Sequence, residues 1–191
     1  MDKKKILIIF LIFIVVLSAV LILSKKISVK EKSVGLEEEK AKNCEIKEEK
    51  IVVRGNSLEP LIKDGQEVRA LIGYYDCNEI KRDDIVLYSY VGSKEPLIKI
   101  VKGIPGDKFE LEKTKDGWHI LINGKVLVNS EGKPYLISER GYKVLSLYEK
   151  DYKNTIPEDA YLILGNLPTG SFDSTEFGLV GRKEILGKVE K

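Results

Sequence analysis

The stretch Arg54-Gly55-Asn56-Ser57-Leu58-Glu59-Pro60 follows a short apolar run, Ile51-Val52-Val53, that predicts a β-strand. Pro60 keeps the residue before it away from helical backbone angles, so the strand is expected to lead into a turn. A serine between a strand end and a proline turn is well placed to present its hydroxyl from rigid backbone. Ser57 is therefore a candidate nucleophile, and an ordinary turn serine is the alternative interpretation.

A second candidate is Lys99, a lone lysine inside the apolar stretch Leu97-Ile98-Lys99-Ile100-Val101. A serine hydroxyl is a weak nucleophile until a base takes its proton, and a lysine can be that base only when neutral. The pKa of a lysine is about 10.4, and loss of solvent can lower it by several units. At strand periodicity Lys99 has apolar neighbours on both faces of the strand, which favours burial and a dyad with Ser57. The alternative is a lysine at the rim of a half-buried strand, with its ammonium group in water.

The composition narrows the possible function classes. The chain has 191 residues, enough for one domain and a tail. Its 32 Lys and Arg residues are balanced by 30 Asp and Glu, which argues against nucleic acid as a partner. The single histidine, His119, excludes metal sites built from several histidines and lies in a strand-like run. A serine nucleophile here would need a base other than histidine.

The two cysteines, Cys44 and Cys77, bear on the cellular compartment. If the domain lies outside the cytoplasm, a disulfide between them is allowed, closing a loop of about 30 residues and contributing roughly 3 kcal/mol. Two free thiols are the alternative. Mass spectrometry under non-reducing conditions would distinguish the two.

The N-terminal region predicts a membrane anchor. Residues 1–5 form a short basic head, and residues 6–24 are apolar apart from Ser18 and Ser24. As a helix the apolar run would span about 27 Å, close to the roughly 30 Å hydrocarbon core of a bilayer. A cleaved signal peptide is the alternative, but no small-x-small cleavage site follows. Lysines on both sides of the run leave its orientation undecided.

The rest of the chain divides into a stalk and a domain. Residues 25–50 are mostly Lys and Glu and predict a solvated stalk without chemistry of its own. Residues 51–191 contain short apolar or alternating runs separated by turn residues, so the predicted fold is mainly β, an antiparallel β domain behind one transmembrane helix. Residues 129–157 are polar and predict an insertion or long loop, and residues 182–191 predict a short last helix or strand.

The predicted strands are joined by recognisable turns. Asn123-Gly124, between two apolar runs, is a strong signal for a two-residue hairpin. We expect strands at residues 51–53, 67–72, 84–90, 97–104, 108–113, 118–122, 125–128, 160–164 and 178–180.

Four short motifs follow one another in the chain. They are Gly55-Asn56-Ser57-Leu58-Glu59-Pro60, then Arg82-Asp83-Asp84-Ile85-Val86, then Lys99-Ile100-Val101-Lys102-Gly103-Ile104-Pro105-Gly106-Asp107, and last Gly165-Asn166-Leu167-Pro168-Thr169-Gly170-Ser171-Phe172-Asp173-Ser174-Thr175. In this order they resemble the boxes of bacterial and organellar type I signal peptidases, the S26 family, which use a Ser–Lys dyad. The run Trp118 to Val126 is similar to the hairpin that follows the lysine box in that family.

Several positions depart from the family pattern. Leu58 stands where methionine is usual, Asp83 where glycine is usual, and Ile100 where arginine follows the lysine. Asn166, Leu167, Pro168 and Thr175 depart from the last box. The Asn-x-Pro and Ser-Phe-Asp-Ser features also resemble the TraF-like conjugative-transfer peptidases, which have the same dyad.

The resemblance implies a role for each matched residue. Ser57 attacks the scissile carbonyl, and neutral Lys99 accepts its proton and later delivers one to the leaving amine. Ser171 would hydrogen-bond the lysine amine, and Asp173 would hold the last box in place; a turn serine and a turn aspartate are the alternatives. The backbone N–H of Ser57 would supply one oxyanion donor. Gly55 can offer only its backbone as the second.

The resemblance also implies partners and location. The substrate would be the extended segment before a preprotein cleavage site, added as a strand to a sheet edge. The lipid bilayer and the secretion translocon are expected partners, and no cofactor is implied. The N-terminus would be cytoplasmic and residues 25–191 would lie outside the cell membrane. A specialised peptidase for one pilin or transfer protein and a non-catalytic, membrane-anchored scaffold are the alternative functions.

Overall fold

The computed structural model describes residues 44–191, which include the whole predicted β domain. The predicted cytoplasmic head, the anchor at residues 6–24 and most of the predicted stalk lie outside the described residues. Within residues 44–191, no helix is long and apolar enough to cross a membrane. The described part is mainly antiparallel β-structure, as the sequence predicted.

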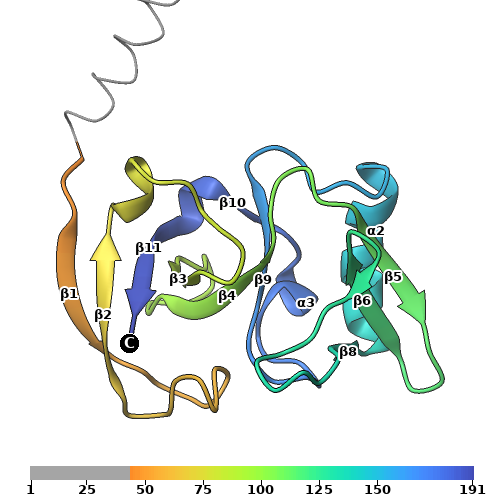
Figure 1. Ribbon diagram of the computed structural model, residues 1–191, viewed down its shortest axis with the longest axis horizontal. Coiled ribbons are helices and arrows are strands. Elements are labelled where there is room, and N and C mark those ends of the chain that lie inside the picture. Colours follow the sequence, from red (N-terminus) through yellow and green to blue (C-terminus); the bar gives the residue numbers. More distant parts are fainter. Residues whose placement is uncertain (1–43) are drawn as a thin grey trace, which may run out of the picture. The chain divides into compact units, whose positions relative to one another are not determined.

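The larger of two sheets has seven antiparallel strands in the order β1-β2-β11-β3-β4-β9-β10 (Figure 1). Its strands are β1 (Lys47–Val52), β2 (Glu67–Ile72), β11 (Ile185–Glu190), β3 (Ile85–Tyr88), β4 (Leu97–Gly103), β9 (Ala160–Leu164) and β10 (Val180–Gly181). The last strand of the chain, β11, lies between β2 and β3. This order leaves β1 at one edge and places β4, the strand that carries Lys99, in the interior of the sheet.

The smaller sheet contains β5 (Phe109–Lys113), β6 (Trp118–Ile122) and β7 (Lys125–Val126), and β8 (Leu136–Ile137) also pairs with β6. Asn123 and Gly124 join β6 to β7 with φ angles of 53° and 73°. A two-residue turn of type I′ requires positive φ at both positions, so the Asn-Gly hairpin prediction is confirmed. Figure 1 shows this sheet beside the long helix α2.

The region predicted as an insertion or long loop contains regular structure. Within residues 129–157 the chain forms β8 and then α2 (Glu139–Asp151), which packs against β5, β8 and the short helix α3 (Ser174–Phe177). Ser138 caps α2, because its hydroxyl accepts a hydrogen bond from the backbone N–H of Gly141 at 3.3 Å. The helix was missed because charged residues at both of its ends make the region read as polar, although Tyr142, Leu145 and Tyr148 follow one another at helical spacing.

Three predicted strands agree with the structure at both ends. Those at residues 67–72, 118–122 and 160–164 match β2, β6 and β9. β1 begins at Lys47, inside the range predicted as stalk, because an edge strand can be charged on both faces. The C-terminal residues form the short 3₁₀-helix η2 (Arg182–Glu184) and then the strand β11. Of the two predicted alternatives, a short helix or a strand, the strand is therefore the main element. A second 3₁₀-helix, η1 (Tyr74–Asp76), follows β2.

β9 separates two apolar cores. Tyr161 and Ile163 contribute to one core, while Leu162 and Leu164 contribute to the other. Alternate side chains of a strand point to opposite faces, so a strand buried on both faces reads as a continuous apolar run. Each fully buried leucine or isoleucine contributes about 1.5–3 kcal/mol of transfer free energy. Because β9 is buried on both faces, it fixes the position at which the following segment, residues 165–173, begins.

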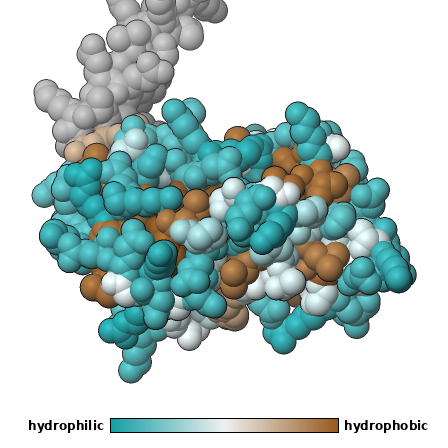
Figure 2. All heavy atoms as spheres, turned by 60° about the horizontal axis from the view of Figure 1, so that its bottom comes forward, coloured by the Kyte–Doolittle hydropathy of each residue, from teal (hydrophilic) through white to brown (hydrophobic). Residues whose placement is uncertain are grey.

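A third core lies under the predicted nucleophile turn. Leu58 and Ile62 are 1% and 0% exposed and pack with Val53, Val68 and Ile100. The outer surface is largely hydrophilic, with apolar side chains in separate patches on the face seen in Figure 2. The apolar residues Val53 and Leu58, before and after Ser57, thus anchor the turn to this core.

Candidate active site

The turn that carries Ser57 has a defined backbone conformation. Gly55 has a φ of 85°, which favours glycine, and its N–H donates to Asp64 Oδ1 at 2.7 Å. The N–H of Glu59 donates to the carbonyl of Asn56 at 3.0 Å, and the Glu59–Pro60 peptide bond is cis. These bonds fold the chain back directly after Ser57, so the serine lies at a tight turn, as the sequence predicted.

Lys99 reaches this turn from β4. Its residue pairs with Val86 of β3, and its side chain is buried, with 3% exposed. The Lys99 Nζ donates a hydrogen bond to Ser57 Oγ at 2.9 Å. The structure therefore brings together the two side chains that the sequence singled out, although they come from separate elements. With a neutral amine, the same contact allows the Ser57 hydroxyl to donate to Lys99.

The surroundings of Lys99 favour its neutral form. Burial lowers the pKa of the Lys99 amine below its usual value, because the ammonium ion loses its hydration. The negative charge of Asp173 acts in the opposite direction and raises the pKa, but burial is the larger effect. An amine with a lowered pKa is neutral over a wider range of pH, which is what a general base requires.

Asp173 is a buried hydrogen-bond acceptor at the centre of the segment that follows β9. Its Oδ2 accepts from the N–H of Gly165 at 2.9 Å and from the hydroxyl of Ser171 at 2.7 Å. Its Oδ1 caps α3 by accepting from the N–H and the hydroxyl of Thr175 at 3.0 and 2.8 Å. Asp173 thus holds together the residues of the predicted last box.

The position of Ser171 differs in detail from the one that the resemblance implied. Its hydroxyl donates to Asp173, and the described residues include no hydrogen bond between Ser171 and Lys99. A serine hydroxyl has one donor and two acceptor lone pairs, so Ser171 retains the capacity to accept from an amine.

Gly165 is the point where this segment meets the nucleophile turn. A Cβ atom at residue 165 would lie 2.3 Å from Ser171 Oγ and 2.7 Å from the Ser57 carbonyl oxygen. Both distances are far below van der Waals contact. Only glycine lets the Ser57 turn and the segment after β9 approach this closely. The glycine that opens the last box is therefore the sequence feature that marks this contact.

A cleft passes through the dyad. It has a volume of about 460 Å³ and is lined by residues of β1, β4 and the turn, Ser57 and Lys99 among them. β9 pairs with β4 only from Ile100 onward, and β1 is an edge strand, so residues 97–99 and the outer edge of β1 have no neighbouring strand on one side. The cleft walls can therefore accept an extended peptide as an added strand. A larger hollow of about 720 Å³ includes neither dyad residue.

The two backbone donors expected near the oxyanion, the N–H groups of Ser57 and Gly55, differ in whether they are occupied. No acceptor among residues 44–191 takes the backbone N–H of Ser57, which leaves this donor free for a substrate oxygen. The N–H of Gly55, the other backbone donor considered from the sequence, is occupied by Asp64. Gly55 is therefore not the second donor in this conformation.

The other residues considered from the sequence, His119, Cys44 and Cys77, do not line the cleft that contains the dyad. His119 is on β6, where it pairs with Glu112 of β5. Within residues 44–191 there is no group of three or more His, Cys, Asp or Glu side chains that could hold a metal ion. Cys44 and Cys77 are both disulfide-bonded, and the chain has two cysteines in all.

Comparison with known proteins agrees with the motif order. The profile of the family described as "Signal peptidase, peptidase S26" matches residues 43–191. Signal peptidase IB of Staphylococcus aureus (strain COL) is 30% identical over 148 residues, covering 72% of this chain and 73% of that protein. Signal peptidase I of Bacillus caldolyticus is 30% identical over 142 residues, covering 73% and 75%.

Among solved structures, a signal peptidase I from Enterococcus faecalis V583 is 25% identical and covers 59% of this chain and 98% of its own, with a TM-score of 0.41. The family assignment therefore comes from the sequence, because the profile spans the whole β domain and two curated relatives each match over more than two thirds of their length. On this evidence the chain belongs to the signal peptidase family, peptidase S26.

Proposed function

We propose that this chain is a membrane-anchored serine endopeptidase that removes signal peptides from translocated preproteins. Ser57 is the nucleophile and Lys99 the general base. The observation that carries the proposal is the 2.9 Å contact between Lys99 Nζ and Ser57 Oγ, at a buried lysine whose pKa is lowered by its surroundings. The family membership of the chain supports the same chemistry.

The reaction follows from this contact. Neutral Lys99 accepts the Ser57 proton while Oγ attacks the scissile carbonyl carbon, and the Ser57 N–H stabilises the developing oxyanion. The Lys99 ammonium then protonates the leaving amine, which releases the mature protein and leaves the signal peptide as an ester on Ser57. Neutral Lys99 next takes a proton from water, the hydroxide hydrolyses the ester, and the Ser57 hydroxyl is restored.

Ser171 and Asp173 act as positioning residues in this proposal. Asp173 fixes Ser171 and Gly165 through its hydrogen bonds, and Gly165 contacts the Ser57 turn. Ser171 accepts a hydrogen bond from the Lys99 amine when the amine turns away from Ser57. The lysine would then have a second hydrogen-bond partner while Ser57 is acylated.

The substrate is proposed to lie between β1 and β4 as an extended strand. The cleft walls carry aliphatic side chains, including Ile51, Val53 and Ile98, which leave room for small side chains next to the scissile bond. Residues 6–24 would anchor the enzyme in the cell membrane, with the N-terminus in the cytoplasm and residues 25–191 outside. Lipid and the secretion translocon would then be its neighbours, and the substrate would be tethered to the same bilayer.

The test is cleavage of a synthetic preprotein with an A-x-A site by detergent-solubilised full-length protein. Ser57→Ala and Lys99→Ala are each expected to abolish cleavage, while Lys102→Ala, a lysine on the same strand that pairs with Asp83, is expected to cleave like the wild type. Circular dichroism and thermal unfolding of each variant verify that it is folded. Turnover by either dyad variant, or no cleavage by folded wild type, would contradict the proposal.

A further inference from the structure

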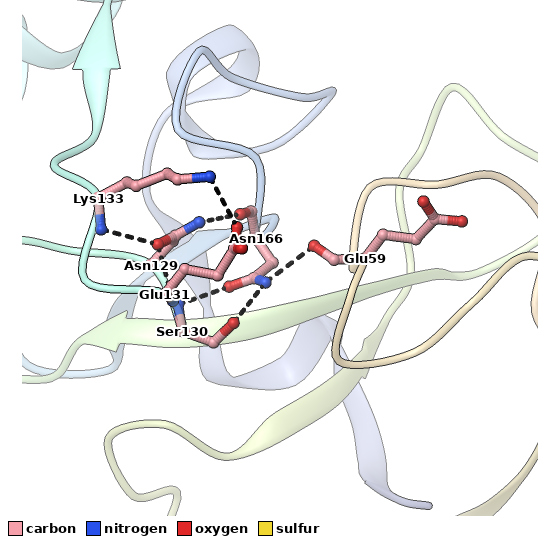
Figure 3. A network of polar contacts seen from close by, with 6 residues as sticks. All are labelled: Glu59, Asn129, Ser130, Glu131, Lys133 and Asn166. Atoms are coloured by element: carbon pink, nitrogen blue, oxygen red, sulfur yellow. Dashed lines mark hydrogen bonds and ion pairs between the residues drawn. The ribbon is translucent and has the colours of Figure 1, made fainter.

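A buried asparagine, Asn166, donates two hydrogen bonds to the turn that carries Ser57. The backbone N–H of Asn166 donates to the Ser57 carbonyl at 2.6 Å, and its Nδ2 donates to the Glu59 carbonyl at 2.9 Å. Asn166 is 0% exposed. Figure 3 shows its side-chain amide directed at Glu59. Two carbonyls that bracket Leu58 are therefore fixed by a single residue that directly follows Gly165.

The same asparagine is held by a second turn, at residues 129–133. Its Nδ2 donates to Ser130 Oγ at 2.8 Å, and its Oδ1 accepts from the N–H of Ser130 at 3.0 Å. The Nδ2 of Asn129 donates to the carbonyl of Asn166 at 3.0 Å. The Asn166 side chain and backbone are thus fixed from the side opposite to the nucleophile turn (Figure 3).

The second turn also has hydrogen bonds of its own. The Oδ1 of Asn129 accepts from the N–H groups of Glu131 and Lys133 at 2.9 and 3.0 Å, and the Lys133 ammonium lies 3.2 Å from the Glu131 carboxylate. These local bonds fix the shape of the turn that contacts Asn166. Three segments that are distant in sequence, residues 57–59, 129–133 and 165–166, are therefore joined in one network.

The chemistry of this network requires an asparagine. The Nδ2 group uses both of its N–H donors, on Glu59 and Ser130, and the Oδ1 is an acceptor. Aspartate has the same shape but offers no N–H, so it would set a carboxylate oxygen against the part-buried Glu59 carbonyl. The asparagine here, which departs from the family box, is matched to Ser130 and Glu59 in this chain.

We infer that Asn166, braced by Ser130, is a positioning residue that holds Ser57 at the correct distance from Lys99. This inference rests on the proposed function, since it concerns the same dyad. Asn166 does not touch the reacting atoms. It acts by fixing the backbone on which Ser57 Oγ is carried, and a displacement of about 1 Å in a reacting group can cost about a hundredfold in rate.

The test compares Asn166→Asp and Ser130→Ala with Asn123→Asp in the full-length protein. Asn123 is the matched control, because its Nδ2 also donates to a side chain, Asp107 Oδ1, in a part-buried hydrogen bond of 2.8 Å, but none of its hydrogen-bond partners belongs to the Ser57 turn. Asn166→Asp is expected to lower kcat for preprotein cleavage about tenfold or more with KM nearly unchanged. Ser130→Ala removes one bond and is expected to act in the same direction, about threefold. Asn123→Asp is expected to leave kcat unchanged.

A second readout does not depend on activity. The amides of Glu59 and Ile62 are hydrogen-bonded within the turn, to Asn56 and Leu58. Hydrogen exchange by mass spectrometry over residues 56–62 is expected to be about tenfold faster in Asn166→Asp and unchanged in Asn123→Asp. If the wild type fails to cleave, the proposed function fails, but the exchange result still tests whether Asn166 holds the Ser57 turn. Unchanged exchange and unchanged kcat in folded Asn166→Asp or Ser130→Ala would overturn the inference, as would an equal loss of kcat in Asn123→Asp.

Discussion

Replacing Gly165 with alanine tests whether the nucleophile turn is held in place by close packing. The added Cβ would lie 2.7 Å from the Ser57 carbonyl oxygen and 2.3 Å from Ser171 Oγ, where ordinary contact begins at 3.4 Å. The Ser171 hydroxyl can rotate aside, but the Ser57 oxygen belongs to the backbone. The turn must therefore retreat by about 0.7 Å, because Gly165 is fixed by its own bond to Asp173.

The size of the effect follows from that displacement. A shift of about 1 Å in a catalytic group costs about a hundredfold in rate, so Gly165→Ala is expected to lower kcat roughly 30- to 100-fold. KM should change little, because the atoms nearest to the added Cβ belong to Ser171 and to the Ser57 carbonyl, and none belongs to the β1 and β4 walls of the cleft. Overpacking of this kind also lowers the free energy of unfolding by about 1–3 kcal/mol.

The assay is steady-state cleavage of the synthetic preprotein, with thermal unfolding of the same samples. Gly103→Ala is the matched control: its Cβ would lie 2.5 Å from Ile156 Cδ1, so it has a similar clash, but with a side-chain methyl that can move. It is expected to lose stability while kcat stays within about twofold. A folded Gly165→Ala enzyme with wild-type kcat would refute the argument, and an equal loss of kcat in Gly103→Ala would show that the loss reflects general destabilisation.

Three further predictions follow from the charges. Burial lowers the pKa of Lys99 in the folded protein, so the free energy of unfolding of the wild type should rise with pH between that pKa and the unfolded value near 10.5. Lys99→Met should be more stable at neutral pH and should lack this rise. Urea unfolding at several pH values would measure both effects. Because Asp173 raises the pKa of Lys99, Asp173→Asn should move the midpoint of the alkaline rise in kcat/KM to lower pH; a midpoint that stays in place or moves up would contradict this. Asp107→Ala leaves Arg82 without its two bonds of 2.7 Å and should cost about 2–3 kcal/mol in urea unfolding, with kcat nearly unchanged.

The local settings of Ser57 and Lys99 made them candidates, and the order of the four motifs, which resembles the family boxes, joined them into a predicted dyad. A lysine with apolar neighbours on both faces of a strand can be buried or can lie at a rim with its ammonium group in water, and in the structure Lys99 is buried in β4. A serine between a strand and a proline leads to a tight turn, and Ser57 lies in one. The strand pattern of β9 was equally readable, since a central strand is apolar on both faces.

Features that depend on contacts distant in sequence were not predictable. β1 is charged at most positions and forms a strand because β2 pairs with it, for example through Lys50 and Glu67 at 2.8 Å. Gly165 and Asn166 read as turn residues, and nothing local reveals that one must lack a Cβ atom and the other must donate to Glu59. Periodicity reports the face that an element buries, but it does not report which distant segment occupies that face.

The opposing influences on Lys99 explain why the site keeps a buried carboxylate near its base. Burial alone would push the pKa of Lys99 down, and a base of very low pKa is always neutral but a poor proton acceptor. Asp173 raises the pKa again, and its four hydrogen bonds, from Gly165, Ser171 and Thr175, keep it in place at 1% exposure. The same carboxylate therefore holds the segment that contacts the Ser57 turn, and it also offsets the loss of basicity that burial imposes on Lys99. A substitution at Asp173 should consequently change geometry and pH dependence together, whereas one at Gly165 should change geometry alone, and this separates the two contributions by experiment.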